Sequence, residues 1–337
     1  MHATRSERDR MAKLFKGAVR FHEGAGAHGL RRLLWQEGSR FDALIVSRPT
    51  PMAALVKAHW RPRKGPGVVY DAEAVLAPRE QRRRKLFGAP WTENKYRAAL
   101  AAELRLARGA NAVTAVGDFD AELIRSMLDV PVFVLPHSVD IRLSAPGSTE
   151  RSDLLFVGRM TGGPIESPNV DSVLWFVEEV MPRLDQLIGS DYRLHLVGRV
   201  EASDVEALAS PRILLHGIVD DIQSLYDQCR LFVAPTRYAA GIPLKVVEAM
   251  GQGIPCVVTR LLAEQLGVDD QALAIGADAD GFAEECARLY NADEDWSSTQ
   301  RAAFAYVART VSPAAFDRTL VQLIDQVGRH VDERSAA

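Results

Sequence analysis

Cysteine and long apolar runs are scarce in this sequence of 337 residues, and neither sign of charge dominates. The three cysteines, Cys229, Cys256 and Cys286, lack the spacing of metal ligands, which indicates a reducing compartment and buried packing roles. No apolar run approaches the length of a membrane span, and residues 1–13 lack the apolar core of a signal peptide. We therefore expect a cytoplasmic protein and leave attachment to a membrane surface open.

The charge balance and the absence of catalytic clusters exclude several classes of function. A formal net charge of −3 argues against a nucleic-acid binder driven by bulk charge. No histidine cluster suggests a metal, and no Ser/His/Asp or Cys/His set has a convincing context. A hydrophobic content of 47% supports well-packed cores, and the length fits two domains.

The second half of the chain alternates short apolar strands with amphipathic helices. Ser167 and Pro168 supply an N-cap and a first helical proline, and Asp220 is expected to cap a later helix. This alternation predicts a doubly wound α/β sheet of parallel strands, with its ligand crevice at their carboxyl ends. The expected strands are residues 154–157, 193–197, 213–215 and 231–234, with another ending at 259.

The first half shows the same pattern with fewer elements. Its expected elements are strands at residues 43–47, 68–70, 112–116 and 132–135, and a helix at 93–108. A polar, turn-rich stretch at residues 136–151 separates the halves. We predict a first domain at residues 1–145, a second at 152–310, and a C-terminal helix at 311–330.

The most informative segment, residues 231–259, reads as strand, small-residue loop, short helix, glycine turn and strand. Residues 239–241 (Ala-Ala-Gly) carry almost no side chain, so a ligand can approach their backbone. A helix beginning near Pro243 would turn free N–H groups and a positive dipole end toward that loop, which favours a phosphate. Lys245 and Glu248 share one face of this helix. The alternative is an ordinary strand–loop–helix unit with a solvated Lys–Glu pair.

Residues 237–246, RYAAGIPLKV, followed by an E-A-M helix from Glu248, resemble the donor-site signature of GT-B glycosyltransferases of glycosyltransferase family 4. Further matches, in the same order as in that family, include residues 68–80, 134–140 and 168–176. Ala240 stands where the family has the first glutamate of its Glu-x7-Glu stretch. Only about forty residues precede Phe41, so the resemblance implies a shortened N-terminal domain.

The resemblance implies two Rossmann-like domains that face a central cleft. It also implies sugar transfer from a nucleotide-diphosphate sugar, with retention of configuration and without a metal or other cofactor. Arg159, Arg237 and Lys245 would stabilise the departing diphosphate, and Glu248 would hold the donor hydroxyls. The predicted donor-site residues are Gly158, Arg159, Arg199, Arg237, Ala240, Gly241, Ile242, Lys245 and Glu248. For Arg159 and Arg199, a salt bridge to a neighbouring helix is the alternative.

The acceptor side of the cleft has three candidates. Asp71 and Glu73 follow an expected strand, and His137 follows the last strand of the first half. A carboxylate there can orient or deprotonate an acceptor hydroxyl, so we predict Asp71, Glu73, His137 and Glu248 as catalytic residues. The alternatives are a loop pair that caps the next element and a structural histidine.

The sequence leaves the acceptor and several partners open. The acceptor can be a saccharide, a lipid-linked molecule or a small molecule. The basic run of Arg79 and residues 82–85 fits either an anionic lipid surface or, as the favoured reading, a solvated helix face. An exposed edge of the shortened domain leaves a homo- or hetero-oligomer open. A non-catalytic GT-B-like scaffold subunit and a nucleotide-sugar epimerase are the competing functions.

Overall fold

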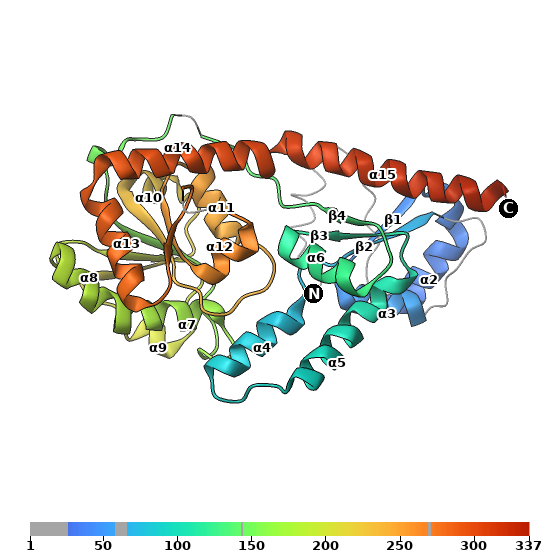
Figure 1. The fold of residues 1–337 in the computed structure, drawn as a ribbon, viewed down its shortest axis with the longest axis horizontal. Helices are drawn as coiled ribbons and strands as arrows, with labels where there is room; N and C mark the ends of the chain where they lie inside the picture. Colours follow the sequence, from blue (N-terminus) through green and yellow to red (C-terminus); the bar gives the residue numbers. More distant parts are fainter. Residues whose placement is uncertain (1–25, 58–65, 143, 269–270, 337) are drawn as a thin grey trace.

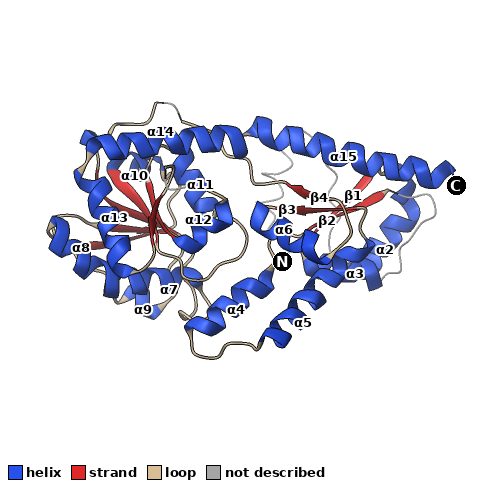
Figure 2. Cartoon of the chain, in the orientation of Figure 1, coloured by secondary structure: helices blue, strands red, loops and turns tan. Residues whose placement is uncertain are grey.

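The computed structural model describes residues 26–57, 66–142, 144–268 and 271–336, which form two α/β units side by side (Figure 1). Residues 1–25, which open the predicted first domain and include the segment examined for a signal peptide, lie outside the described residues. Each unit has a parallel sheet covered by helices (Figure 2). The predicted fold class is therefore confirmed.

The first sheet has four parallel strands in the order β1-β2-β3-β4. Its strands are β1 (Ala43–Ser47), β2 (Gly67–Asp71), β3 (Ala112–Ala115) and β4 (Val132–Val134). Its helices are α2 (Gly26–Glu37), α3 (Pro49–Lys57), α4 (Leu76–Leu86), α5 (Glu93–Leu104) and α6 (Asp118–Met127). The expected helix at 93–108 ends earlier, because its last residues tighten into a 3₁₀ turn at Arg105–Gly109.

The second sheet has six parallel strands in the order β10-β9-β8-β5-β6-β7. Its strands are β5 (Ser152–Val157), β6 (Leu194–Val197), β7 (Ile213–Gly217), β8 (Cys229–Ala234), β9 (Cys256–Thr259) and β10 (Ala274–Gly276). Its helices are α7 (Pro168–Trp175), α8 (Met181–Ile188), α9 (Ser203–Glu206), α10 (Gln223–Gln228), α11 (Leu244–Gly251), α12 (Arg260–Leu266), α13 (Ala279–Asn291) and α14 (Asp293–Thr310).

Local signals in the sequence account for several of these boundaries. The Ser167 hydroxyl accepts a hydrogen bond from the Val170 N–H at 3.4 Å, and Pro168 opens α7 as predicted. The expectation that Asp220 caps α10 was wrong, because the N-cap is Ile222, which makes no side-chain cap hydrogen bond. Asp221 accepts the Gln223 N–H at 2.8 Å, as in an Asx turn.

The cores follow the apolar patterning of the strands. All six residues of β8 are buried, as a strand covered on both faces requires. The three cysteines are unpaired and buried, which confirms their predicted packing role. Within the described part of the chain, no helix is both long enough and apolar enough to cross a bilayer.

The C-terminal helix links the two units. α14 belongs to the second unit, and α15 (Pro313–Ala336) continues from it across the first sheet (Figure 1). Leu323 and Val327 pack with Val69 and Ala112 in a small apolar cluster. A Cβ at Gly67 would lie 2.2 Å from a methyl group of Val327, so glycine permits this close contact.

Candidate functional site

The strand order of the second sheet reverses between β5 and β8, which are neighbours in space. In an open parallel sheet, the carboxyl ends of the strands at such a switch point form the ligand crevice. Gly158 and Arg159 follow β5, and residues 235–243 follow β8. The topology therefore gathers most of the predicted donor-site residues at this point.

Lys245 is the residue at this point with the most unusual surroundings. Its ammonium donates to Oδ1 of Asn169 at 2.8 Å and lies 4.0 Å from the ring centroid of Phe156. Within the described residues, no carboxylate forms an ion pair with it. Burial lowers the pKa of Lys245 to about 7. Lys245 is partly exposed, and a half-buried cation whose described partners are neutral is suited to an anionic ligand.

Asn169 holds this lysine, and our sequence analysis did not identify it. Its side-chain NH₂ donates a hydrogen bond to the backbone oxygen of Arg159 at 3.0 Å, and its side-chain oxygen accepts one from the Lys245 ammonium. A Cβ at Gly158 would lie 2.8 Å from the amide carbon of Asn169, so glycine allows this contact. Its position in the sequence could have identified it, because Asn169 is the second residue of the helix that follows β5.

The two arginines that follow glycines at strand ends differ in their partners. Arg159 is exposed, and it has no ion pair among the residues that the structure describes. Arg199 pairs with Glu201 at 3.4 Å, with both side chains about half exposed. An ion pair of this kind contributes little, because water screens it. Arg159 is therefore more available than Arg199 to bind a ligand.

Arg237 already has a carboxylate partner. Its guanidinium makes two hydrogen bonds to Asp171, whose side chain is only 1% exposed, and it lies 5.6 Å from the ring centroid of Trp175. This contact fixes the loop after β8 to α7. A direct contact between Arg237 and a diphosphate stays a prediction. The ion pair with Asp171 gives Arg237 a second role, which is to position the loop after β8.

The small-residue loop before α11 contacts the first unit. Gly241 has φ of +70°, and a Cβ there would lie 3.1 Å from the Cβ of Ala74 and 3.4 Å from Val116. A Cβ at Gly117 would lie 2.9 Å from a methyl group of Ile242. The first unit therefore occupies the space beside the Gly241 Cα, and a ligand contact to the backbone of this loop stays a prediction. Ala240 is partly exposed.

Helix α11 buries its apolar face and exposes Glu248. Pro243 is its N-cap, just before the expected first turn, and Val246, Val247 and Met250 are fully buried. Glu248 is exposed on the opposite face. Burial of part of its carboxyl raises the pKa of Glu248, while nearby His137 acts in the other direction.

On the acceptor side, Asp71 is held by hydroxyl groups. Its carboxylate accepts from the Ser47 hydroxyl at 2.7 Å and from the Thr114 hydroxyl at 2.9 Å. These residues come from the carboxyl ends of β1 and β3, on either side of β2. The arrangement leaves Asp71 well oriented at the sheet edge that faces the second unit.

Glu73 is paired with Arg48, which our sequence analysis also missed as a site residue. The Arg48 Nε lies 2.8 and 2.9 Å from the two carboxylate oxygens of Glu73. Both residues have a positive φ, +74° for Arg48 and +53° for Glu73. Residues other than glycine rarely adopt a positive φ outside functional sites or tight turns. His137 is exposed in the segment between the units.

The basic run lies on α4 and reaches the second unit. Arg82 pairs with Glu264 at 3.7 Å, and Arg79 lies 5.8 Å from the ring centroid of Tyr238. Arg83 and Arg84 both pair with Glu80. Arg79 and Arg82 therefore lie against the second unit and not on a fully solvated face, whereas the pairs that Arg83 and Arg84 form with Glu80 on the same helix are compatible with one. Lys85 is exposed.

Metal coordination has no candidate in the described ranges, since no group of three or more His, Cys, Asp or Glu residues there could hold an ion.

Comparisons with known proteins give a family for the second unit. Residues 151–292 match the family model described as "Glycosyl transferases group 1". No curated protein matches the sequence.

Similar folds occur among solved structures, all at low sequence identity. HepE of Anabaena, in complex with UDP and glucose, is 14% identical with a TM-score of 0.67, covering 96% of this chain and 90% of HepE. Sucrose-phosphate synthase from Thermosynechococcus elongatus is 14% identical with a TM-score of 0.67, covering 89% and 76%. TarM is 14% identical with a TM-score of 0.63, covering 88% of this chain, which spans only 58% of TarM. At such identities the likeness shows the fold alone.

Proposed function

Since the chain belongs to the group 1 glycosyltransferases and has the GT-B fold, we propose that it transfers a sugar from a nucleotide-diphosphate sugar to an acceptor hydroxyl. The observation that carries the proposal is the half-buried Lys245 ammonium at the switch point of the second sheet, whose partners among the described residues are all neutral. Structures of HepE and TarM contain UDP, which makes UDP-sugars the first donors to test.

The donor half of the reaction depends on positive groups around the leaving diphosphate. Lys245, Arg159 and the N-terminus of α11 would stabilise the negative charge that develops as the sugar–phosphate bond breaks. Asn169 and the ring of Phe156 would hold the lysine in place. Glu248, on the exposed face of α11, would accept hydrogen bonds from donor hydroxyls.

The acceptor half depends on the carboxyl ends of β1 to β3. Asp71 or Glu73 would orient the attacking hydroxyl, and His137 would meet the substrate from the linker. The Gly241 loop lies against Ala74 of the first unit, and closure of the two units over the substrates would exclude water. Retention of configuration, independence from metals and a cytoplasmic location follow from the family resemblance. The acceptor can be a saccharide, a lipid-linked molecule or a small molecule.

The direct test is incubation with a panel of nucleotide sugars, with detection of released nucleoside diphosphate. Release supports transfer or slow donor hydrolysis. A changed sugar on an intact nucleotide would instead support an epimerase. Binding without turnover of any donor, in the presence of a broad acceptor panel, would support a scaffold subunit.

The lowered pKa of Lys245 predicts how donor affinity depends on pH. Only the ammonium form attracts a diphosphate, and in the free protein this form is lost as pH rises through about 7. Binding of the anion raises the pKa, so UDP affinity should fall above pH 7 by up to about tenfold per pH unit. Calorimetric titrations from pH 6 to 9 measure this. A Lys245→Arg variant stays charged throughout and should show a flat profile.

The contact at Gly241 predicts a loss of turnover without a matching loss of nucleotide affinity. Valine at this position would place a branched side chain at φ +70° and against Ala74, which separates the units. We expect kcat to fall roughly tenfold or more, while UDP affinity changes by less than about threefold. Gly189→Val is the matched control, because Gly189 has φ of +78° but no atom within 4 Å of its Cβ position. Equal losses in the two variants would contradict a role for the contact.

A further inference from the structure

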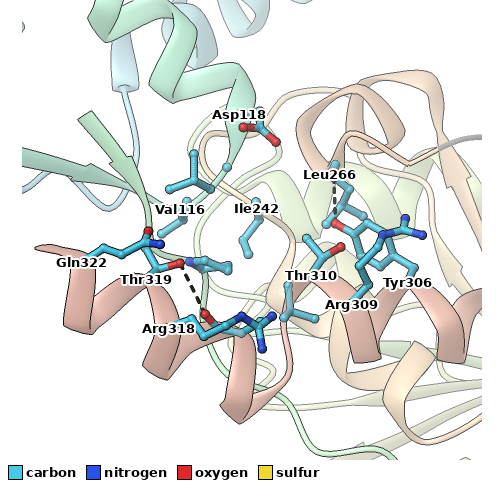
Figure 3. Close-up of a pocket in the computed structure, with 15 residues that line it drawn as sticks. Val116, Asp118, Ile242, Leu266, Tyr306, Arg309, Thr310, Arg318, Thr319 and Gln322 are labelled. Atoms are coloured by element: carbon cyan, nitrogen blue, oxygen red, sulfur yellow. Dashed lines mark hydrogen bonds between the residues drawn. The ribbon is translucent and has the colours of Figure 1, made fainter. Parts of the chain in front are cut away.

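A cavity of about 340 Å³ lies where the two units meet the α14–α15 junction. In Figure 3, Asp118 at the start of α6 lies on one side of it, and side chains of α14 and α15 lie on the other. Val116, Ile242 and Leu266 contribute apolar lining from both units. The cavity therefore depends on both units being in place.

The polar lining carries a net positive charge. Arg309 on α14 and Arg318 on α15 are exposed, and neither forms an ion pair within the part of the chain that the structure describes. Among the described residues that line the cavity, Asp118 is the only carboxylate. Unpaired guanidinium groups at the mouth of a concave site are suited to a phosphate, which they can bind with several hydrogen bonds.

Two hydroxyl groups of the lining already donate their protons to backbone oxygens. The Tyr306 hydroxyl donates to the backbone oxygen of Leu266 at 2.7 Å, and that of Thr319 donates to Ala315 at 3.3 Å (Figure 3). Their oxygens can still accept from a ligand. Burial raises the pKa of Tyr306 to about 12, with Asp118 raising it further and Arg309 lowering it. Both charges therefore act on the same buried phenol.

We propose that this cavity binds a phosphorylated sugar or polyol, with the phosphate on Arg309 or Arg318 and the hydroxyls toward Asp118. Its volume falls at the lower end of the range for small-molecule sites, which is about 300–1,000 Å³, and suits a monosaccharide. Lys245, Asn169 and Phe156 do not line this cavity, and Ile242 is the predicted donor-site residue that does.

Occupancy of the cavity also predicts a regulatory effect, which rests on the proposed function. The ligand would contact α6, α15 and Ile242, which lies just before the donor-site helix. It would therefore favour the arrangement in which the units are together, and UDP affinity should rise when the cavity is filled. By linkage, UDP would strengthen the binding of the phosphorylated ligand by the same factor.

The experiment is calorimetry with glucose 6-phosphate and inorganic phosphate at constant ionic strength, with glucose as the uncharged comparison. We expect wild-type protein to bind glucose 6-phosphate more tightly than phosphate and glucose to bind undetectably. Arg309→Ala/Arg318→Ala should lose at least about tenfold in affinity, since it removes charge-assisted contacts. Arg301→Ala, an exposed arginine elsewhere on α14, should bind as wild type does.

Two further variants keep the sites distinguishable. Lys245→Ala should lose UDP and keep glucose 6-phosphate, and Asp118→Asn should bind inorganic phosphate more tightly. No binding by the wild type, equal binding by the double variant, or loss of glucose 6-phosphate in Lys245→Ala would each overturn the cavity site. If glucose 6-phosphate still binds Lys245→Ala and no nucleotide binds the wild type, only the proposed function is refuted. Unchanged UDP affinity at saturating glucose 6-phosphate would overturn the regulatory effect.

Discussion

Replacing Lys245 with methionine is expected to weaken UDP binding by roughly 100-fold and to stabilise the protein at the same time. The loss of affinity reflects one strong charge-assisted contact to the diphosphate, worth about 1.5–3 kcal/mol. Affinity is measured by calorimetry at pH 6, where the wild-type lysine carries its charge.

The gain in stability follows from the direction of the pKa shift. The pKa of Lys245 is about 7 in the folded protein and near 10.5 when unfolded, so the unfolded chain binds more protons between these values. Folding stability therefore rises with pH across this window, and below pH 7 the full cost of the enclosed charge is present. Methionine removes that cost, so Tm at pH 6 should rise by roughly 2–6 °C.

The matched control is Lys85→Met, since Lys85 is exposed on α4 and has no ion pair in the described structure. It should change neither UDP affinity nor Tm measurably. An unchanged affinity in Lys245→Met would contradict the donor site. A lower Tm would contradict the view that Lys245 is kept for binding at the expense of stability.

Arg237→Met should cause the largest loss of stability among the site variants. It leaves the carboxylate of Asp171, which is 1% exposed, without its arginine. Removing one partner of a buried ion pair costs about 3–5 kcal/mol, and in a protein of this size that lowers Tm by about 10 °C. Chemical denaturation at pH 7 gives the change in the free energy of unfolding.

The double variant Asp171→Asn/Arg237→Met separates the positioning role from a phosphate contact. It removes the stranded charge, so most of the lost stability should return. If Arg237 instead binds the diphosphate directly, the single variant would keep its stability and lose UDP affinity. That result would favour the direct contact that the sequence predicts.

The sequence predicted the second sheet well because its strands are short apolar runs separated by strong turn and cap signals. It missed β10 (Ala274–Gly276), which is only three residues long, too short to establish a period. It also placed the cap of α10 on Asp220, whereas the N-cap is Ile222 and the nearby Asp221 accepts the Gln223 N–H. The strand order, with its reversal between β5 and β8, depends on pairings far apart in sequence.

The donor site was predictable where the motif is contiguous, from Arg237 to Glu248. Asn169 and Phe156 were not, because each contacts Lys245 only once α7 and β5 are packed together. The Arg237–Asp171 pair joins residues 66 positions apart. Because of this ion pair, a residue predicted to contact the ligand has a structural role. No local sequence pattern indicates an ion pair between residues so far apart.

The most direct test of the account is a crystal structure of the protein with UDP. We predict that the diphosphate lies about 3 Å from the Lys245 ammonium and meets the first turn of α11, with Asn169 still holding the lysine. A diphosphate bound away from this helix, with Lys245 left on its neutral partners, would contradict the assignment of the donor site.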